Sequence, residues 1–270
     1  MKLGGLVSGG GLVLASGLGA CVESGAATQD GAARAVDSTA PCAAGYAICE
    51  GFEDTPLGQV PHGWTPNGYG RRTLGVADDQ AARGERSLKI EVEAEQGPVV
   101  AMLLRGRLGD LGASHYGRSF LRIEGPGASQ FVHFDAFEGT GGWEGQNNQV
   151  RWASTGTEPG SESGNWSWIY NVQPSEYREF GREGDRSAHP VVDSWMCLEW
   201  FFDADAQQAS FWYQGRPVEY LALDAAQAMR TEIPIFRSLS VGFQKFQQTD
   251  AFVVWVDEIA FDAERIGCEG

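Results

Sequence analysis

The chain has 270 residues, of which 42% are hydrophobic and 11% aromatic, so it can bury the core of one all-β domain, and wholesale disorder is not expected. Its formal net charge is -16 and its sequence pI is about 4.6, which argues against nucleic acid or an anionic membrane surface as a partner. The same charge disfavours a polyanionic ligand unless basic residues gather in the site. In the simpler interpretation, an acidic surface only keeps an exported protein soluble.

Residues 1–20 have the pattern of a secretory signal, because Lys2 precedes an uncharged stretch that is too short and too glycine-rich for a good membrane span. The stretch ends in Leu-Gly-Ala-Cys at 18–21, which resembles a bacterial lipobox. The resemblance implies that Cys21 is lipidated and that acyl chains are the membrane attachment. Because Val22 is not Asp, it also implies sorting to the outer membrane or cell surface. In the alternative, an ordinary signal is cleaved nearby and Cys21 stays unmodified.

The segment 21–45 is rich in Ala, Gly, Ser and Thr and has no periodic apolar face, so we expect a flexible tether before a domain at 46–270. The cysteines besides Cys21 are Cys42, Cys49, Cys197 and Cys268. Four cysteines in an oxidising compartment predict two disulfides, and three connectivities are open. They form no CxxC pair, so a zinc site is not expected.

From residue 46 onward, apolar residues alternate or form short runs bounded by Gly, Pro, Asn and Asp, which is typical of β-strands. The predicted strands are 46–53, 87–93, 99–105, 117–124, 130–137, 148–153, 165–172, 195–203, 209–214, 235–246 and 252–261. Gln214 and Gly215 predict a hairpin turn, and one short helix is expected at about 222–230. We expect long polar loops at 138–148 and 154–164. The pattern predicts a sandwich or jelly roll.

Three groups of short motifs follow one another in a recognisable order. They are Gly-Phe-Glu-Asp at 51–54 with Pro-His-Gly-Trp at 61–64, Gly-Glu-Arg-Ser-Leu-Lys-Ile at 84–90, and Val-Trp-Val-Asp-Glu-Ile at 254–259. This order resembles the concanavalin A-like polysaccharide lyases and related jelly-roll carbohydrate modules, above all the fungal cellulose-induced core domain that is similar to glucuronan lyases. The resemblance covers most of 46–268. It implies an all-β jelly-roll β-sandwich of two antiparallel sheets, a monomer, with polysaccharide as its partner.

The resemblance also implies a structural Ca²⁺ ion that ties the first strand to the last. Its ligands would be Glu53 and Asp257, with oxygen atoms near Ser87, since hard oxygen ligands suit calcium. Alternatively, Asp257 caps a turn and Glu53 is solvated.

The same pairing bears on the disulfides, because opposed residues of an antiparallel pair have a constant sum of residue numbers. The sum for Glu53 and Asp257 equals that for Cys42 and Cys268. This favours Cys42–Cys268 and leaves Cys49–Cys197, unless a bulge changes the register.

Lyases of this family cleave uronic-acid polymers by β-elimination, which needs a group that neutralises the uronate carboxylate, a base and an acid. Beside these requirements we assign neutralisation to Arg118 and Arg122, the base and acid roles to His133 or Tyr170, and orientation of the substrate to Gln149. All candidates are expected to meet on the concave face of one sheet. The further substrate-binding candidates are Asp135, Arg151, Trp168, Gln244 and Lys245.

The sequence departs from the family pattern at one position. Gln244 stands where alginate lyases carry the catalytic tyrosine, so an enzyme would need Tyr170 or Lys245 instead. This departure favours the alternative function, a non-catalytic carbohydrate-binding surface lipoprotein. Trp143, Trp166 and Trp168 would then stack on sugar rings, although core packing explains Trp166 and Trp168 equally well. Likewise His133 can be a core histidine, and the two arginines can form surface ion pairs.

Overall fold

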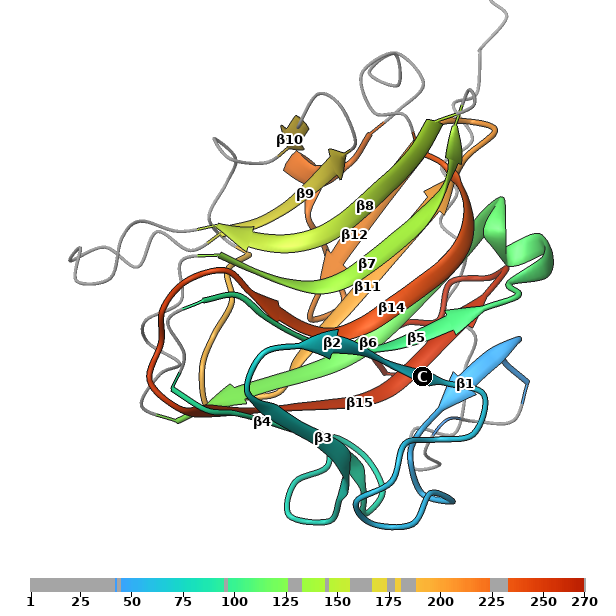
Figure 1. The fold of residues 1–270 in the computed structure, drawn as a ribbon. Helices are drawn as coiled ribbons and strands as arrows, with labels where there is room; N and C mark the ends of the chain where they lie inside the picture. Colours follow the sequence, from blue (N-terminus) through green and yellow to red (C-terminus); the bar gives the residue numbers. More distant parts are fainter. Residues whose placement is uncertain are drawn as a thin grey trace, which may run out of the picture. The chain divides into compact units, whose positions relative to one another are not determined.

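The structure is a computed structural model that describes residues 42, 45–94, 97–125, 133–143, 146–155, 167–173, 178–180, 188–223 and 233–269. Within these residues the chain forms two antiparallel β-sheets that lie one in front of the other (Figure 1). We call them sheet A and sheet B. The all-β sandwich of two antiparallel sheets predicted from the sequence is therefore confirmed.

Sheet A contains the strands from both ends of the domain. Its strand order is β13-β12-β11-β6-β15-β4-β3, and β1 also pairs with β15. Its strands are β1 (Ile48–Glu50), β3 (Arg72–Ala77), β4 (Ser87–Val92), β6 (Ser114–Glu124), β11 (Met196–Asp203), β12 (Gln208–Tyr213), β13 (Arg216–Pro217) and β15 (Phe252–Asp262). Ile48 lies opposite Phe261, so the first and last strands lie side by side, as the resemblance implies.

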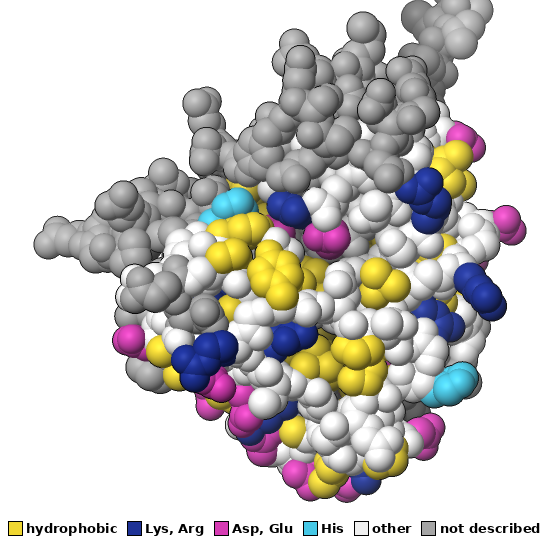
Figure 2. Space-filling view, viewed as in Figure 1, with side chains coloured by type: hydrophobic (Ala, Val, Ile, Leu, Met, Phe, Trp, Pro, Cys, Tyr) yellow, Lys and Arg dark blue, Asp and Glu magenta, His cyan; other side chains and the backbone are white. Residues whose placement is uncertain are grey.

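Sheet B is the layer nearer the viewer in Figure 1, and Figure 2 shows the molecule from the same side. Its strand order is β10-β9-β8-β7-β14-β5-β2. Its strands are β2 (Thr65–Tyr69), β5 (Val99–Gly106), β7 (His133–Trp143), β8 (Gln146–Thr155), β9 (Ser167–Gln173), β10 (Arg178–Phe180) and β14 (Ile235–Lys245). Two short 3₁₀ turns, Gly109–Gly112 and Glu219–Leu221, complete the described elements. In the part of the chain that is described, no helix has the length and hydropathy to cross a membrane.

Every predicted strand overlaps a strand of the structure, and the predicted hairpin turn is present. Gln214 and Gly215, between β12 and β13, have φ values of 52° and 74°, the left-handed backbone that such a two-residue turn requires. The prediction of a loop at 138–148 is wrong, because β7 continues to Trp143 and pairs with β8 from Gln146. Most of the predicted loop at 154–164 and of the predicted helix at 222–230 lies outside the described residues.

The strands β2, β3 and the short β10 were not predicted from the sequence. Strand β2 reads Thr-Pro-Asn-Gly-Tyr and all five residues are exposed, so it has no apolar alternation. It lies at one edge of sheet B and β3 at one edge of sheet A, where pairing on one side is enough and proline is tolerated. A strand that buries neither face leaves no hydrophobic signal in the sequence.

Aromatic side chains fill the space between the sheets. Trp152 and Trp168 from sheet B and Trp200, Phe202 and Phe211 from sheet A are all at most 1% exposed. The ring of Trp152 lies 6.0 Å from that of Trp200 and 4.9 Å from that of Phe211. Edge-to-face contacts of this kind stabilise aromatic pairs beyond their buried area. Side chains that point to this interior are therefore held in the core and cannot bind a ligand.

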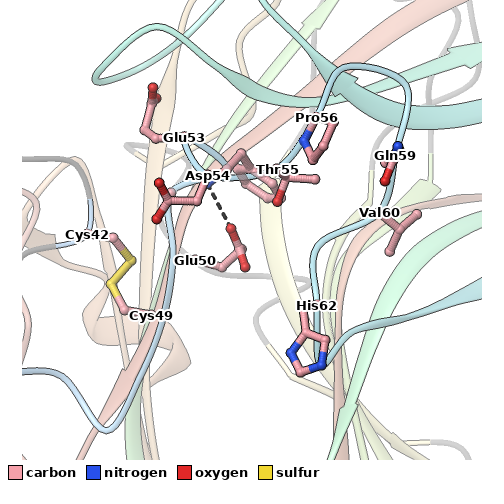
Figure 3. Close-up of a pocket in the computed structure, with 12 residues that line it drawn as sticks. Cys42, Cys49, Glu50, Glu53, Asp54, Thr55, Pro56, Gln59, Val60 and His62 are labelled. Carbon is pink, nitrogen blue, oxygen red and sulfur yellow. Dashed lines mark hydrogen bonds between the residues drawn. A yellow bond between two sulfur atoms is a disulfide. The ribbon is translucent and has the colours of Figure 1, made fainter.

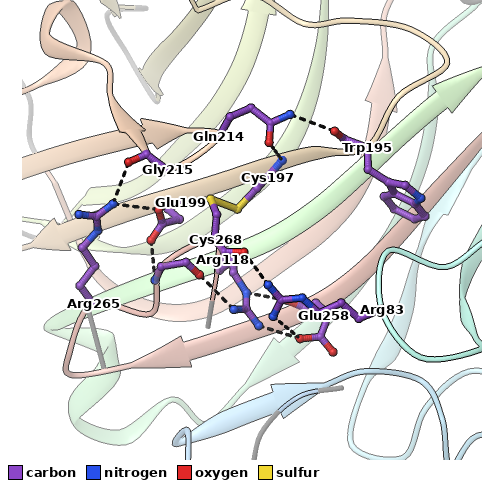
Figure 4. The surroundings of a disulfide bond; sticks show 11 residues. Arg83, Arg118, Trp195, Cys197, Glu199, Gln214, Gly215, Glu258, Arg265 and Cys268 are labelled. Carbon is purple, nitrogen blue, oxygen red and sulfur yellow. Dashed lines mark hydrogen bonds and ion pairs between the residues drawn. A yellow bond between two sulfur atoms is a disulfide. The ribbon is translucent and has the colours of Figure 1, made fainter. Parts of the chain in front are cut away.

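The disulfides join Cys42 to Cys49 and Cys197 to Cys268 (Figures 3 and 4). The pairing favoured from the sequence, Cys42–Cys268 with Cys49–Cys197, is wrong. The first disulfide closes a short loop that begins before β1 and ends within it. The second attaches the C-terminal segment to β11, so each disulfide secures one end of the domain.

The reason lies in the ladder between β1 and β15. The predicted pairing assumed that Glu53 lies opposite Asp257 in a continuous ladder. In the structure the ladder ends at Glu50, and Phe52 has a φ of 66°, so the chain turns away before Glu53. On the other side, the register between β15 and β6 shifts after Asp257. Residue-number arithmetic fails where a ladder ends or is bulged.

Candidate functional site

The outer face of sheet B, which points away from sheet A, carries polar side chains from two neighbouring strands. We call them the His133 cluster: His133, Asp135 and Glu138 from β7 and Arg151 from β8. Glu138 lies opposite Arg151 in the ladder, and the next pair, Phe137 and Trp152, belongs to the core. Because successive strand residues point to opposite faces, Glu138 and Arg151 point outward.

A β-bulge brings Asp135 to the same face as Glu138. Residues three apart in a regular strand point to opposite faces. Here the register between β7 and β8 shifts between Asp135 and Phe137, which adds one residue to β7. Both carboxyl groups therefore reach Arg151, whose Nε lies 3.3 Å from Oδ2 of Asp135 and 3.6 Å from Oε2 of Glu138.

His133 is the most exposed member of the cluster. Its side chain is 27% exposed, whereas that of Asp135 behind it is fully buried. The imidazole Nε2 lies 3.8 Å from Oδ1 of Asp135, and the ring centroid lies 4.6 Å from that of Phe246. The guanidinium of Arg151 lies 5.8 Å from the same Phe246 ring. Phe246 thus packs against both His133 and Arg151, and the cluster presents an imidazole at the surface above a buried carboxyl group.

Burial raises the pKa of Asp135 to about 8; the Arg151 charge lowers it and the Glu138 charge raises it further. Within the described residues neither oxygen of Asp135 has a hydrogen-bond partner. At neutral pH the Asp135 carboxyl group is therefore mostly protonated and does not cancel the charge of Arg151. A carboxyl group with a strongly shifted pKa beside an imidazole is typical of a functional site.

This shift predicts how stability depends on pH. Between the ordinary pKa of 3.8 and the folded-state pKa of about 8, folded Asp135 holds a proton that the unfolded chain releases. Its contribution to stability is complete below about pH 4 and is lost as the pH rises through about 8. We expect Asp135→Asn to flatten the fall in melting temperature across this range.

The measurement is thermal unfolding at a series of pH values for the native protein and the Asp135→Asn variant. Asp205→Asn, at an exposed position, controls for the loss of one carboxyl group. Part of the slope should remain, because burial also raises the pKa of Asp257 to about 8. Parallel curves for the native protein and the Asp135→Asn variant would contradict the raised pKa.

The structure separates Arg118 and Arg122 from the cluster, which corrects the prediction that all candidates share one face. Both lie on β6 in sheet A. Arg118 is fully buried and donates from Nη2 to Oε2 of Glu258 at 2.8 Å. Arg122 lies opposite Trp255 and donates to Glu124 and to the carbonyl of Asp193. Both arginines are engaged in contacts within sheet A and its adjoining loops, so neither meets a substrate at His133.

Three other candidates also do not reach the outer face of sheet B. Trp168 and Tyr170 alternate with outward residues along β9 and point into the core, where Tyr170 packs against Phe202 and Phe211. Tyr170 is therefore not the phenol that the lyase hypothesis needs. The buried Lys245 donates from Nζ to the carbonyls of residues 97 and 247, at 3.0 Å and 2.8 Å. These bonds fasten the end of β14 to the neighbouring turns.

The remaining candidates lie on β7, β8 and β14 of sheet B. Asp135, Arg151 and His133 form the cluster, Gln244 lies opposite Asp135 in the adjoining ladder, and Gln149 lies opposite Thr140. The side chain of Trp143 and all of Trp166 lie outside the described residues.

Two residues of the site, Glu138 and Phe246, were not predicted from the sequence. Glu138 falls in the segment predicted as a loop, because the bulge breaks the apolar alternation of β7 just before it. Phe246 follows the last residue of β14 and looks like one more apolar residue of that strand. Its role shows only when its ring is found beside His133 and Arg151.

The side chains of the predicted calcium ligands form hydrogen bonds with backbone groups of the loop before β4. Oε1 of Glu53 accepts from the amides of residues 85 and 86, both at 2.9 Å. Oδ2 of Asp257 accepts from the amides of residues 82 and 83, at 2.8 Å and 3.1 Å, and Ser87 donates to the carbonyl of Gln80. No group of three or more possible metal-binding side chains occurs among the described residues. The side-chain oxygens of these residues are directed at backbone partners, which does not fit a calcium site, and calcium stays a prediction of the resemblance.

A cavity of about 600 Å³ lies elsewhere, between the first disulfide and His62 (Figure 3). Its acidic lining residues are Glu50, Glu53 and Asp54. Burial raises the pKa of Glu50, and the charge of Asp54 raises it further. Three acidic side chains disfavour an anionic ligand in this cavity. The His133 cluster is therefore the candidate site.

Comparison with known proteins supports the fold. No family model matches the chain, and no curated protein matches it in sequence. Among solved structures, the cellulose-induced protein Cip1 has a TM-score of 0.55 and 15% identity over 82% of this chain and 99% of its own. The endo-β-1,4-glucuronan lyase of the fungus Trichoderma reesei has a TM-score of 0.51 and 11% identity, over 81% of this chain and 95% of its own. The T. cruzi calreticulin globular domain has a TM-score of 0.50 and 9% identity, over 82% and 88%. The chain thus has the concanavalin A-like β-sandwich fold, which hosts more than one function.

Proposed function

We propose that the protein acts on an acidic polysaccharide outside the cell, and that it cleaves uronic-acid chains by β-elimination at the His133 cluster. The observation that carries the proposal is the meeting of His133, Arg151 and the buried Asp135 on the outer face of sheet B. The fold shared with a glucuronan lyase is consistent with this chemistry. The net charge of -16 is no obstacle if Arg151 supplies local positive charge.

In this mechanism Arg151 pairs with the uronate carboxylate and makes the neighbouring C–H more acidic. With Asp135 protonated, Glu138 is the anionic partner of Arg151 within the cluster, and the uronate carboxylate would share the guanidinium with it. Neutral His133 takes the C5 proton, the electron pair of the C–H bond forms the C4–C5 double bond, and the C4–O bond breaks. The leaving oxygen then receives a proton from the imidazolium of His133. One group serves as base and acid because Tyr170 lies in the core.

The alternative function is a carbohydrate-binding surface protein without catalytic activity. Two points favour it: the resemblance puts Gln244 at the position of the family tyrosine, and Tyr170 faces the core. Gln244 is itself 6% exposed on the face of the cluster. An amide can hydrogen-bond to sugar hydroxyls but cannot transfer a proton at neutral pH.

The experiment incubates the protein with glucuronan, alginate and other uronans and follows the ultraviolet absorbance of the unsaturated product. We expect His133→Gln to lower the rate at least about 100-fold, since a positioned proton-transfer group contributes that much or more. His189→Gln, at an exposed histidine that is not a member of the cluster, is the matched control. No product on any uronan, with polysaccharide retention that needs Arg151, would support the binding alternative and exclude the lyase.

We also propose that the protein is exported and lipid-anchored through Cys21. The disulfides, which persist in oxidising compartments, support export. The anchor rests on the residues at 18–21 alone, which lie outside the described residues.

A further inference from the structure

An exposed tyrosine lies at the far edge of sheet B. Tyr69 is the last residue of the edge strand β2, and its side chain is one of the most exposed large apolar groups of the described chain, at 54%. An exposed aromatic ring offers a flat apolar face on which a sugar ring can stack. The position of this ring relative to the His133 cluster shows what the ligand would be.

The register places Tyr69 and Asp135 on the same face of sheet B. Tyr69 lies opposite Val100 on β5, Val100 opposite Gln244 on β14, and Gln244 opposite Asp135 on β7. Residues directly opposite in antiparallel strands point to the same face. Val100 accordingly lies outside the core cluster, whereas its neighbour Val99 is part of it. Tyr69 and the His133 cluster therefore face the same side of the sheet.

The distance between the two is suited to a chain of sugars. Neighbouring strands are about 4.8 Å apart, so the three steps from β7 to β2 span about 14 Å. The side chains on this line between the ends are Gln244 and Val100, each 6% exposed. Figure 2 shows hydrophobic and charged side chains interspersed on this face rather than a patch of one charge. A linear polymer lying across the strands from the cluster would reach Tyr69.

Asn67 adds a polar group beside the ring. It lies two residues before Tyr69 on β2, opposite Met102, and is exposed. Residues two apart on a strand share a face, so the amide and the ring point in the same direction. An aromatic face for sugar C–H groups next to an amide for hydroxyls is the combination that sugar-binding sites use.

We infer that Tyr69 and Asn67 form a sugar-binding subsite for the same polysaccharide chain whose reacting residue lies at His133. This inference rests on the proposed function and deepens it. The subsite holds the polymer several sugars away from the scissile bond by stacking and hydrogen bonds, and it takes no part in proton transfer. Long chains engage both positions, whereas a disaccharide at the cluster cannot reach Tyr69.

The test compares Tyr69→Ala, Tyr69→Phe and the native protein on long polymers and short oligomers of one polysaccharide. Binding is measured by affinity electrophoresis in glucuronan, alginate, xylan and a β-glucan, and cleavage by product absorbance. We expect Tyr69→Ala to weaken binding of long chains roughly five- to tenfold, with disaccharide affinity unchanged and product still formed at saturating polymer. Tyr69→Phe keeps the ring and should restore binding. Leu57→Ala, at a side chain 51% exposed, is the control.

Each outcome decides the inference. Unchanged binding by Tyr69→Ala, an equal loss on disaccharide, or failure of Tyr69→Phe to restore binding would overturn the subsite. If the native protein cleaves uronans and Tyr69→Ala binds long chains as tightly as the native protein does, the subsite fails and the proposed function stands. If the native protein neither retains nor cleaves any of the four polysaccharides, both fail together. If it retains one without cleaving it and Tyr69→Ala loses that retention, the subsite stands and the lyase fails.

Discussion

Replacing Glu258 by alanine is expected to lower the free energy of unfolding by about 3–5 kcal/mol, which is typical when one partner of a buried ion pair is removed. Glu258 is fully buried, and its Oε2 accepts from Nη2 of Arg118 at 2.8 Å and lies 3.6 Å from Nη1 of Arg83 (Figure 4). Its Oε1 accepts from the amide of Cys42 at 2.5 Å. Without this carboxylate the buried guanidinium of Arg118 loses its compensating charge. The prediction is checked by urea unfolding.

Two further variants test the cause. Glu93→Ala removes one partner of an exposed ion pair with Arg71, and exposed pairs contribute little, so it should leave the unfolding midpoint almost unchanged. The double variant Arg118→Met with Glu258→Leu removes both buried charges and should recover part of the loss. A double variant less stable than Glu258→Ala would show that the charge left unpaired is not the cause.

Removal of the Cys197–Cys268 disulfide is expected to cost about 4 kcal/mol, and removal of Cys42–Cys49 about 2 kcal/mol. The loops closed in the unfolded chain have sequence separations of 71 and 7, and the larger loop restricts the unfolded chain more. The measurement is denaturant unfolding of the two paired Cys→Ser variants beside the native protein.

The C-terminal segment gives a second reason for the larger effect. The amide of Gly267 donates to Oε1 of the buried Glu199 at 2.8 Å, and its carbonyl accepts from Arg118 at 3.1 Å. The carbonyl of Cys268 accepts from Arg83 at 2.5 Å. If the disulfide no longer holds this segment, these buried charged groups lose partners when it detaches. Equal losses from the two disulfide variants would contradict both reasons.

The sequence predicted the individual strands better than the arrangement of side chains between them. The strands β6, β7, β8, β9 and β14 were all located, and so were His133, Asp135, Gln149, Arg151 and Gln244 on the outer face of sheet B. Arg118 was placed on the wrong sheet, because alternation along β6 shows which residues share a face but not which sheet the strand joins. Tyr170 was placed on the wrong face. Alternation along β9 shows that Trp168 and Tyr170 share a face, but it does not show whether that face or the face of Asn171 points to the core.

By itself, the sequence determined the fold class, the strands with an apolar face and the acidic character of the protein. These follow from local alternation and composition, which each segment carries independently of its neighbours. Only the tertiary structure decided the disulfide pairing, the sheet to which each arginine belongs and the joining of Asp135 with Glu138 at one site. Those features depend on where ladders end and where bulges shift the register, and both are set by packing between segments far apart in the chain.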